Sequence, residues 1–282
     1  MRVLVVGATG QLGQALQDEL RVRHVIAYDR QRLDITNRAV TRRVIEQAKP
    51  DVVINAAAYT RVDQAESDHD TAYRVNALGP QNLALATASL DIPLLHVSTD
   101  YVFDGTQEFP YHEFDRPNPT SVYGKSKLAG EEIVRATTQR HFIVRTAWLY
   151  HTRGQNFPKT IYGLAQQSQV RVVSDQWGSP TYAPHLARAI NTLLDTEAYG
   201  TFHLAGSGGT SWYGFTQELF QRLGVQAEVS PVVTTEFPRP APRPAYAILT
   251  TLQDPSIILP PWQEGVAEFA KAFGNNRSLT TI

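Results

Sequence analysis

The chain opens with Val3-Leu4-Val5-Val6-Gly7-Ala8-Thr9-Gly10-Gln11-Leu12-Gly13, directly after its first two residues. Four apolar residues in succession predict a buried strand, and the residues from Gln11 onward predict a helix. Gly7, Gly10 and Gly13 stand where a tight turn, close approach of a ligand and close helix–strand packing exclude side chains. A helix that begins at such a turn presents free backbone N–H groups to an anion. The segment therefore predicts a strand–loop–helix unit that holds the pyrophosphate of a dinucleotide.

Short apolar runs alternate with helical patterns through the first half of the chain. Strands separated by helices indicate βαβ units, which build a parallel sheet. The apolar runs show no polar alternation, as expected for strands that are covered on both faces. We therefore predict an α/β protein with a Rossmann-like, doubly wound parallel sheet. The expected strands are Val3–Val6, His24–Tyr28, Asp51–Asn55, Pro93–Ser98 and Phe142–Thr146, and the expected helices are Gln11–Leu20, Asn37–Ala48, Thr71–Ser89 and Ser121–Thr138.

The second half has a less regular pattern and predicts a smaller C-terminal lobe over the carboxyl ends of the strands. We expect residues 1–150 to form the dinucleotide-binding Rossmann domain, with part of 165–200 returning to it, and 151–282 to form mainly a substrate-binding lobe. Proline dominates from Pro231 to Pro244, and Phe237–Pro244 must be extended. The expected elements here are strands Val170–Val173 and Thr201–Ala205, helices Pro184–Leu194 and Trp212–Leu223, and a glycine-rich loop, Gly206–Ser211, that caps the last helix.

Two adjacent residues at the end of the second strand give opposite indications of the cofactor. Asp29 stands where a carboxylate binds a ribose 2′-hydroxyl and repels a 2′-phosphate. Arg30 follows at once, and a guanidinium there favours a 2′-phosphate. The pattern therefore predicts NADPH or NADH without deciding between them.

Other strand ends carry residues suited to the same ligands, because ligands bind at the carboxyl edge of a doubly wound sheet. Asp34 and Ile35 lie at one such end. The run Asn55-Ala56-Ala57-Ala58-Tyr59-Thr60 lies at another, where small alanines let a cofactor lie against the backbone. Ser98-Thr99-Asp100 closes the next strand, and a hydroxyl there can polarise a carbonyl oxygen.

Tyr123 is followed four residues later by Lys127 on a predicted helix. Residues four apart share a helix face, so the phenol and the ammonium point the same way. A nearby ammonium favours the phenolate and eases proton transfer, which suits an acid/base group for an alcohol or a carbonyl. The pair therefore predicts proton transfer to or from an oxygen, next to the dinucleotide that the glycine loop would hold.

Composition and charge exclude several other classes of protein. The net charge is −1 at pH 7 with scattered basic residues, so neither nucleic acid nor a membrane is an expected partner. There is no cysteine, and the eight histidines show no metal-binding spacing, so we expect no metal. The apolar start is too short for a signal peptide or a membrane span, and we expect a cytoplasmic protein.

Taken in order along the chain, these motifs resemble those of the extended short-chain dehydrogenase/reductases. A more specific resemblance, over nearly the full length, is to the dTDP-4-dehydrorhamnose reductases. It rests on Ala57-Ala58-Tyr59-Thr60-x-Val62-Asp63, Ser98-Thr99-Asp100-Tyr101-Val102-Phe103-Asp104-Gly105, Arg145-Thr146-x-Trp148-x-Tyr150, Asp175-Gln176-x-Gly178-x-Pro180-Thr181, Ser211-Trp212-Tyr213 and the Phe237–Pro244 segment.

The resemblance implies that NAD(P)H reduces the C4 ketone of dTDP-4-dehydro-β-L-rhamnose to give dTDP-L-rhamnose, the last step of dTDP-rhamnose biosynthesis. Tyr123 would donate the proton, Lys127 would hold the nicotinamide ribose and tune Tyr123, and Thr99 would hydrogen-bond the ketone oxygen. The implied cofactor-binding residues are Gly7, Gly10, Gln11, Leu12, Gly13, Asp29, Arg30, Asp34, Ile35, Ala57, Ala58, Tyr59, Thr60, Tyr123 and Lys127. The implied substrate-binding residues are Thr99, Asp100 and Trp148 for the sugar, and Asn156 and Arg243 for the diphosphate.

The chain also departs from the pattern of these reductases. His151 replaces a glycine, Ala247 replaces a serine, and a lysine expected near Thr250 is absent. These changes bear on substrate affinity and nucleotide preference. Some relatives carry a glutamate at the position of Ala15 that helps to bind magnesium at a dimer contact, so a metal-linked dimer is not expected here, although a homodimer is still open.

Two alternatives are also consistent with the motifs. The first is another sugar-nucleotide reductase, an epimerase or a 4,6-dehydratase on the same fold. Dehydratases typically have Thr-Asp-Glu, whereas Tyr101 follows Thr99-Asp100 here, which argues against elimination. The second is a non-catalytic NADP-binding regulatory subunit similar to the β subunit of methionine adenosyltransferase. The complete set of Thr99, Tyr123 and Lys127 favours an enzyme.

Overall fold

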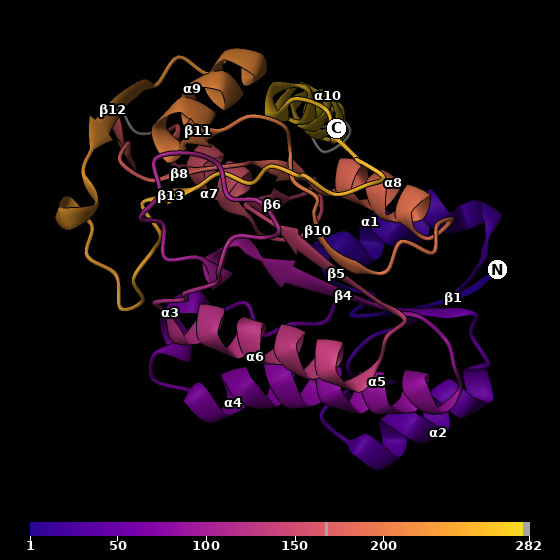
Figure 1. Ribbon diagram of the computed structural model, residues 1–282. Helices are drawn as coiled ribbons and strands as arrows, with labels where there is room; N and C mark the ends of the chain where they lie inside the picture. The colour runs from indigo at the N-terminus through magenta and orange to yellow at the C-terminus, as the bar shows by residue number, and fades with distance from the viewer. Residues whose placement is uncertain (167–168, 279–282) are drawn as a thin grey trace.

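The computed structural model describes residues 1–166 and 169–278, and its centre is a sheet of six parallel strands (Figure 1). The strands are β1 (Arg2–Val6), β2 (His24–Tyr28), β3 (Val52–Asn55), β4 (Leu94–Thr99), β5 (His141–Thr146) and β10 (Gly200–His203), in the order β10-β5-β4-β3-β1-β2. The chain leaves β1 for β2 on one side and continues to β3 on the other, so the strand order reverses beside β1. Such a reversal opens a crevice at the carboxyl ends of the strands. The predicted Rossmann-like α/β fold is confirmed.

Helices cover both faces of this sheet, which explains why most residues of the central strands are apolar. Val3 and Val5 of β1 belong to one hydrophobic core, and Leu4 and Val6 belong to the other, because successive side chains of a strand point to opposite faces. The first core lies under α1 (Gln11–Glu19) and α8 (Ala183–Leu193), and the second lies over α2 (Arg38–Ala48), α5 (Gly79–Ser89) and α6 (Val122–Thr137), as Figure 1 shows.

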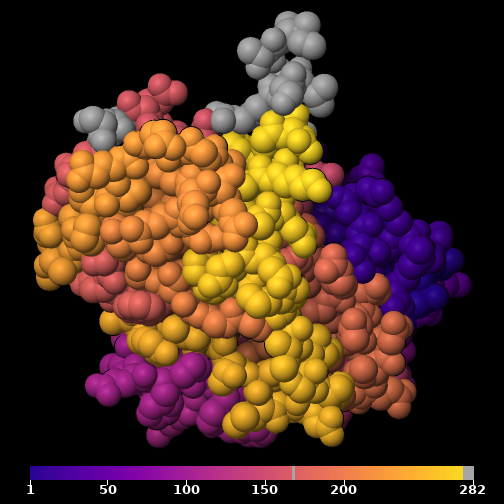
Figure 2. All heavy atoms as spheres, turned by 90° about the horizontal axis from the view of Figure 1, so that it is seen from above, coloured from indigo at the N-terminus to yellow at the C-terminus, as the bar shows by residue number. Residues whose placement is uncertain are grey.

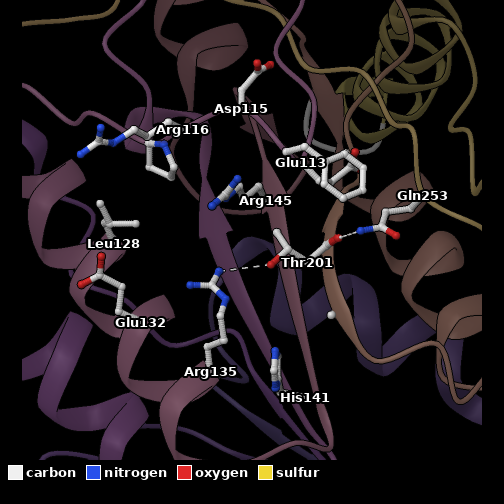
Figure 3. A pocket seen from close by; sticks show the side chains of 13 residues that line it. Glu113, Asp115, Arg116, Leu128, Glu132, Arg135, His141, Arg145, Thr201 and Gln253 are labelled. Atoms are coloured by element: carbon white, nitrogen blue, oxygen red, sulfur yellow. Dashed lines mark hydrogen bonds between the residues drawn. The ribbon is translucent and has the colours of Figure 1, made fainter.

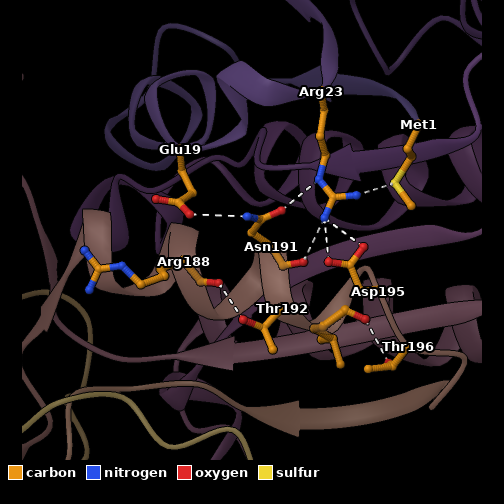
Figure 4. A network of polar contacts seen from close by, with 9 residues as sticks. Met1, Glu19, Arg23, Arg188, Asn191, Thr192, Asp195 and Thr196 are labelled. Atoms are coloured by element: carbon orange, nitrogen blue, oxygen red, sulfur yellow. Dashed lines mark hydrogen bonds and ion pairs between the residues drawn. The ribbon is translucent and has the colours of Figure 1, made fainter.

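Helix α8 belongs to the second half of the sequence but lies beside α1. Arg23, at the start of β2, donates to Asn191 Oδ1 over 2.8 Å and pairs with Asp195 at 2.8 Å. Asn191 in turn donates to Glu19 Oε1 at 3.3 Å, so one polar network joins α1, β2 and α8 (Figure 4). With β10 in the sheet as well, two elements after residue 180 lie among those of the first half.

One helix prediction is wrong in detail. The segment expected as a single helix over Thr71–Ser89 contains α4 (His69–Tyr73), a π-helical turn η2 (Arg74–Leu78) and α5. Pro80, in the first turn of α5, has no N–H, and its ring displaces the carbonyl of Asn76 one turn earlier. Gly130 of α6 leaves space for that carbonyl, since a methyl group there would overlap the Asn76 oxygen.

The remaining elements form a smaller lobe with its own core of aromatic and aliphatic side chains, among them Phe215, Leu219 and Phe269. Figure 2 shows its orange and yellow segments side by side on one face of the molecule. The expected helix at Trp212–Leu223 is confirmed as α9, and the expected strand at Val170–Val173 is part of β7. The lobe contains α7 (Phe157–Leu164), α9 (Trp212–Leu223), α10 (Trp262–Ser278), β7 (Gln169–Val173) paired with β12 (Glu228–Val232), β6 (Leu149–Tyr150) paired with β9 (Thr181–Tyr182), and a sheet of β11 (Thr210–Ser211), β8 (Trp177–Gly178) and β13 (Tyr246–Ala247).

Four short helical segments complete the described elements. They are α3 (Val62–Ala65), η1 (Leu20–Val22), η3 (Asp100–Val102) and η4 (Thr234–Glu236). Of these, α3 and η3 begin just beyond β3 and β4, at the edge of the sheet where ligands are expected.

Candidate active site

The glycine loop forms a cradle that no side chain could share. Gly7 has φ +80°, and a methyl group on it would lie 2.6 Å from the amide nitrogen of Ala57. A methyl group on Gly13 would overlap the carbonyl oxygen of Gly7. Gly10 begins α1 without any side-chain cap, so the first N–H groups of the helix stay available to an anion. This loop fits the pyrophosphate of a dinucleotide.

Two adjoining cavities open at the carboxyl ends of the strands. One, of about 460 Å³, lies between the loops that follow β1, β2 and β3, and the other, of about 600 Å³, extends to the ends of β4 and β5 and to α6. Thr9, Gly10, Ala56, Ala58 and Thr60 line both, so they form one elongated space. The predicted site residues that line it are Gly7, Gly10, Gln11, Leu12, Arg30, Asp34, Ile35, Ala57, Ala58, Tyr59, Thr60, Thr99, Asp100, Tyr123, Lys127 and Trp148.

Asp29 does not line either cavity, which departs from the expectation for a ribose ligand. Its Oδ1 accepts a hydrogen bond from the backbone N–H of Arg32 at 3.0 Å, so this carboxylate stabilises the turn after β2. Arg30 does line the smaller cavity, with Nε 3.9 Å from Asp34 Oδ2 and an exposed side chain. Of Asp29 and Arg30, which gave opposite indications of the cofactor, only Arg30 therefore lines the cavity.

Two predicted diphosphate ligands are also placed elsewhere. Asn156 caps α7 and donates to Gln11 Oε1 at 2.9 Å, which joins the smaller lobe to the glycine loop. Arg243 donates from both terminal nitrogens to Asp63, at 2.6 and 2.9 Å. In this structure the guanidinium is engaged by a carboxylate, and its role toward a phosphate stays a prediction. Neither residue lines the two cavities.

Tyr123 and Lys127 face the larger cavity from the first turns of α6. Ser121 caps this helix by accepting from Gly124 N at 3.1 Å, which fixes the point at which it begins. The Lys127 ammonium is 2% exposed and donates to the carbonyl oxygen of Val97 at 2.5 Å. Tyr123 lies one helical turn earlier on the same side.

Burial determines the protonation of this pair. It raises the pKa of Tyr123 to about 12, and a hydrogen bond with Thr99 acts in the opposite direction. It lowers the pKa of Lys127 to about 8, against the effect of the Glu131 carboxylate. The effect of burial outweighs the contacts that favour the phenolate, so Tyr123 keeps its proton near neutral pH. That Lys127 favours the phenolate stays a prediction. A phenol that keeps its proton is suited to act as an acid.

Thr99 and Asp100 lie at the end of β4 beside the phenol. Thr99 Oγ1 donates to Asp100 Oδ1 at 2.9 Å and accepts from the backbone N–H of Tyr101 at 3.2 Å. Burial raises the pKa of Asp100 to about 7, although hydrogen bonds from Thr99 and the backbone lower it in part. Within the described residues, Asp100 Oδ2 has no hydrogen-bond partner, so it can receive a hydroxyl of a ligand.

Glu131 and Arg145 form a buried ion pair that links the helix carrying Tyr123 to the central sheet. Sequence reasoning did not single them out as a pair. Arg145 donates to Glu131 Oε2 at 2.7 Å, and Ser98 Oγ donates to Glu131 Oε1 at 2.5 Å. The contacts join α6, which carries Tyr123, to β4 and β5. The signal in the sequence is an arginine within the otherwise apolar strand around Phe142–Thr146.

Arg145 also borders a separate cavity of about 670 Å³ at the edge strand β10. Figure 3 shows Glu132 and Arg135 of α6 on one side of it and Thr201 and Gln253 on the other. None of the predicted catalytic, cofactor or substrate residues lines this cavity, so it is not part of the candidate site.

Among residues 1–166 and 169–278, no group of three or more His, Asp or Glu side chains is arranged to hold a metal ion. Within the same ranges, no helix is both long and apolar enough to span a membrane.

Comparison with known proteins identifies the family. The family model described as the RmlD substrate binding domain matches residues 1–275. The chain belongs to this family. The resemblance found in the sequence motifs is therefore confirmed.

Relatives within the RmlD family are similar over nearly their whole length. The dTDP-4-dehydrorhamnose reductase of Mycobacterium tuberculosis is 42% identical over 291 residues, covering 99% of this chain and 95% of the relative. A solved structure of a dTDP-4-dehydrorhamnose reductase from Clostridium acetobutylicum has a TM-score of 0.95 and 44% identity, covering 97% of this chain and 100% of that chain. The reductase of Bacillus anthracis, solved in complex with NADP, has a TM-score of 0.94 and 41% identity, covering 96% and 99%.

Three of the departures from the family pattern, Ala15, His151 and Ala247, lie at interior positions. Ala15 is 2% exposed in α1 and packs in the core shared with α8. His151 is 4% exposed and accepts from the backbone N–H of Arg153 at 3.0 Å through Nδ1. Ala247 pairs with Gly178 in the small sheet of the lobe. Each of these residues packs within the protein rather than lining the two cavities.

Proposed function

We propose that the protein reduces the C4 ketone of dTDP-4-dehydro-β-L-rhamnose to dTDP-L-rhamnose with NAD(P)H, the last step of dTDP-rhamnose biosynthesis. The observation that carries the proposal is the convergence of Tyr123, Lys127 and Thr99 on one cavity that continues into the glycine cradle. Similarity over nearly the full length to proteins named dTDP-4-dehydrorhamnose reductase supports the choice of substrate.

The geometry suits a reduction in which the protein supplies a proton. A reduced nicotinamide, when bound, supplies the hydride that C4 accepts. Tyr123 donates its phenolic proton to O4, so the ketone becomes a secondary alcohol and the phenol becomes a phenolate. Thr99, hydrogen-bonded to Asp100 and beside Tyr123, offers a second polar contact to the same oxygen.

Lys127 stabilises the negative charge that Tyr123 acquires. Its ammonium is held by the carbonyl of Val97, so its position does not depend on the ligand. A buried cation close to a forming phenolate lowers the free energy of the charged state, because water does not screen the interaction. The proposed role of Lys127 is therefore largest as the proton leaves Tyr123.

A spectrophotometric assay of the purified protein distinguishes the proposed reductase from the regulatory alternative. Purified protein with dTDP-4-dehydrorhamnose is expected to oxidise NADPH or NADH, seen as falling absorbance of the reduced nicotinamide. Cofactor binding by calorimetry without turnover with either cofactor would contradict the reductase and favour a non-catalytic subunit. Inversion of configuration at a carbon next to the C4 ketone, without net oxidation of the cofactor, would favour an epimerase.

We expect activity to fall as the pH rises through about 8. Burial lowers the pKa of Lys127 to about 8, so the ammonium loses its charge above this value, whereas Tyr123, with a pKa of about 12, stays protonated. The pH dependence of kcat at saturating substrates measures this fall in activity at alkaline pH. In Lys127→Arg the residual activity should keep its value to higher pH, because a guanidinium stays charged. If activity fell at the same pH in this variant, a group other than Lys127 would be responsible for the fall.

We propose a preference for NADPH, because Arg30 lines the cavity and Asp29 is used in the turn. Arg30→Ala is expected to raise the KM for NADPH roughly tenfold, as charge-assisted hydrogen bonds to a 2′-phosphate are lost, and to leave the KM for NADH unchanged. Arg32→Ala is the matched control, since Arg32 does not line this cavity. Equal effects of Arg30→Ala on both cofactors would contradict the preference.

The proposed partners are small molecules, a nucleotide sugar and NAD(P)H. A cytoplasmic location and a homodimer stay predictions, which cell fractionation and light scattering of the purified protein would test.

A further inference from the structure

A histidine, His96, is fully buried within strand β4. Its register partner on β3 is Asn55, which is also fully buried. Polar groups cost free energy when they leave water, unless they find hydrogen-bond partners. Within the part of the chain that the structure describes, His96 Nε2 has no hydrogen-bond partner. An aliphatic side chain would avoid this cost, so the stability of the strand alone does not explain a histidine here.

The hydrogen bonds around Asn55 determine which nitrogen of His96 carries the proton. The backbone N–H of Ala57 donates to Asn55 Oδ1 at 3.2 Å, so the oxygen of this amide faces Ala57. The amide nitrogen Nδ2 then faces His96 and lies 3.0 Å from its Nδ1. An amide nitrogen only donates, so Nδ1 must accept, and the proton of the neutral ring lies on Nε2. Burial lowers the pKa of His96 well below its usual range, and the charge of Lys127 acts in the same direction, so the ring is neutral.

This chain of hydrogen bonds ends at the loop that follows β3, beside the glycine cradle. Ala57 lines the smaller cavity, and its amide nitrogen lies close to Gly7, since a methyl group on Gly7 would come within 2.6 Å of it. The backbone N–H of Ala56 donates to the carbonyl oxygen of Val6 at 3.0 Å, so the loop begins in contact with β1. The Asn55 amide therefore holds the loop against the cradle, and His96 holds the amide in one orientation.

We propose that His96 is a positioning residue for cofactor binding, which orients the Asn55 amide and, through it, the Ala57 backbone at the wall of the dinucleotide cavity. His96 itself lines neither of the two cavities of the candidate site. The proposal rests on the proposed function, because it takes NAD(P)H as the ligand. It assigns to a buried residue of the sheet a part in the affinity for the cofactor.

Calorimetry with NADPH tests the proposal without turnover. His96→Leu removes the acceptor for Asn55 Nδ2 and should raise the Kd for NADPH about tenfold, as expected for a lost hydrogen bond. His96→Asn should restore most of the affinity, because its amide oxygen can accept from the same donor. His141→Leu is the matched control. It also removes a buried histidine from a neighbouring strand, but His141 contacts Thr138 and lines neither of the two cavities, so the Kd should not change.

A double-mutant cycle shows whether His96 acts through Asn55. Asn55→Ala removes the contacts with both His96 and Ala57, and should raise the Kd for NADPH at least as much as His96→Leu does. Adding His96→Leu to Asn55→Ala should cause no further rise, because the contact that His96 supplies is already lost. Effects that add fully would overturn the inference, since a general loss of structure produces that result.

Nitrogen NMR of protein labelled in histidine gives a second readout. The signal that disappears in His96→Asn should be that of a neutral ring with its proton on Nε2. A proton on Nδ1, an unchanged Kd in His96→Leu, or an equal rise of the Kd in His96→Asn would overturn the inference. Cofactor binding without turnover by the wild type would overturn only the proposed reductase. A wild type that binds neither NADPH nor NADH would overturn both.

Discussion

Replacement of Tyr123 by phenylalanine should lower kcat by roughly 10²–10⁴-fold, the usual contribution of a general acid. The variant keeps the ring and the packing of Tyr123 against Tyr101, whose ring centroid is 5.4 Å away, but has no proton to give. Because burial raises the pKa of Tyr123 to about 12, the wild-type phenol is protonated over the whole neutral range. The loss should therefore appear at every pH between about 6 and 8.

Single-turnover measurements separate this chemical defect from a binding defect. The Kd for NAD(P)H should change little in Tyr123→Phe, since the substitution leaves the backbone cradle at Gly7, Gly10 and Gly13 unchanged. Tyr73→Phe is the matched control, because Tyr73 is 40% exposed on α4 and lies outside both cavities. A wild-type rate in Tyr123→Phe would remove this residue from the mechanism.

Loss of the Glu131 carboxylate should reduce the free energy of unfolding by about 3–5 kcal/mol, the usual effect of leaving one member of a buried ion pair alone. Glu131 is fully buried and Arg145 is 2% exposed. Burial raises the pKa of Glu131, but Arg145, Ser98 and Arg135 together outweigh it and lower that pKa. In Glu131→Ala the Arg145 guanidinium stays buried without this partner, which accounts for the size of the loss.

Urea denaturation of the purified variants measures this effect. Glu132→Ala is the control at the next residue of α6, where the side chain is exposed, and it should change the free energy of unfolding by less than about 0.5 kcal/mol. The double variant Glu131→Ala with Arg145→Met should recover part of the loss, because no charge is then left unpaired. A single variant as stable as the wild type would show that water reaches Arg145.

The predicted site residues that line the cavities were identified mainly from short motifs with fixed spacing. Gly7, Gly10 and Gly13 follow from one loop, and Tyr123 with Lys127 follows from one helical turn. Predicted residues that do not line the two cavities are ones whose side chains have a choice of partners. Asp29 directly precedes Arg30, which lines the smaller cavity, but its carboxylate accepts from the N–H of Arg32.

Arg243 shows the same limit over a longer distance. Its motif was consistent with a phosphate ligand, but the fold brings it to Asp63, which is 180 residues away in the chain. The two-residue strands of the smaller lobe were missed for a related reason, since they are too short to carry a period of alternation. The π-helical turn at Arg74–Leu78 was missed because its cause includes the space that Gly130 leaves on another helix.

The sequence by itself determined the class of fold, the glycine loop and the helical spacing that brings Tyr123 and Lys127 to one cavity, because these depend on backbone freedom and on contacts within a few residues. Only the tertiary structure decided that the pKa of Tyr123 is raised to about 12, that Arg30 rather than Asp29 lines the cavity, and that Arg145 pairs with Glu131. Those properties arise from burial and from contacts between distant segments, such as Arg243 with Asp63. Burial and such contacts are set by the whole fold, so no local pattern in the sequence specifies them.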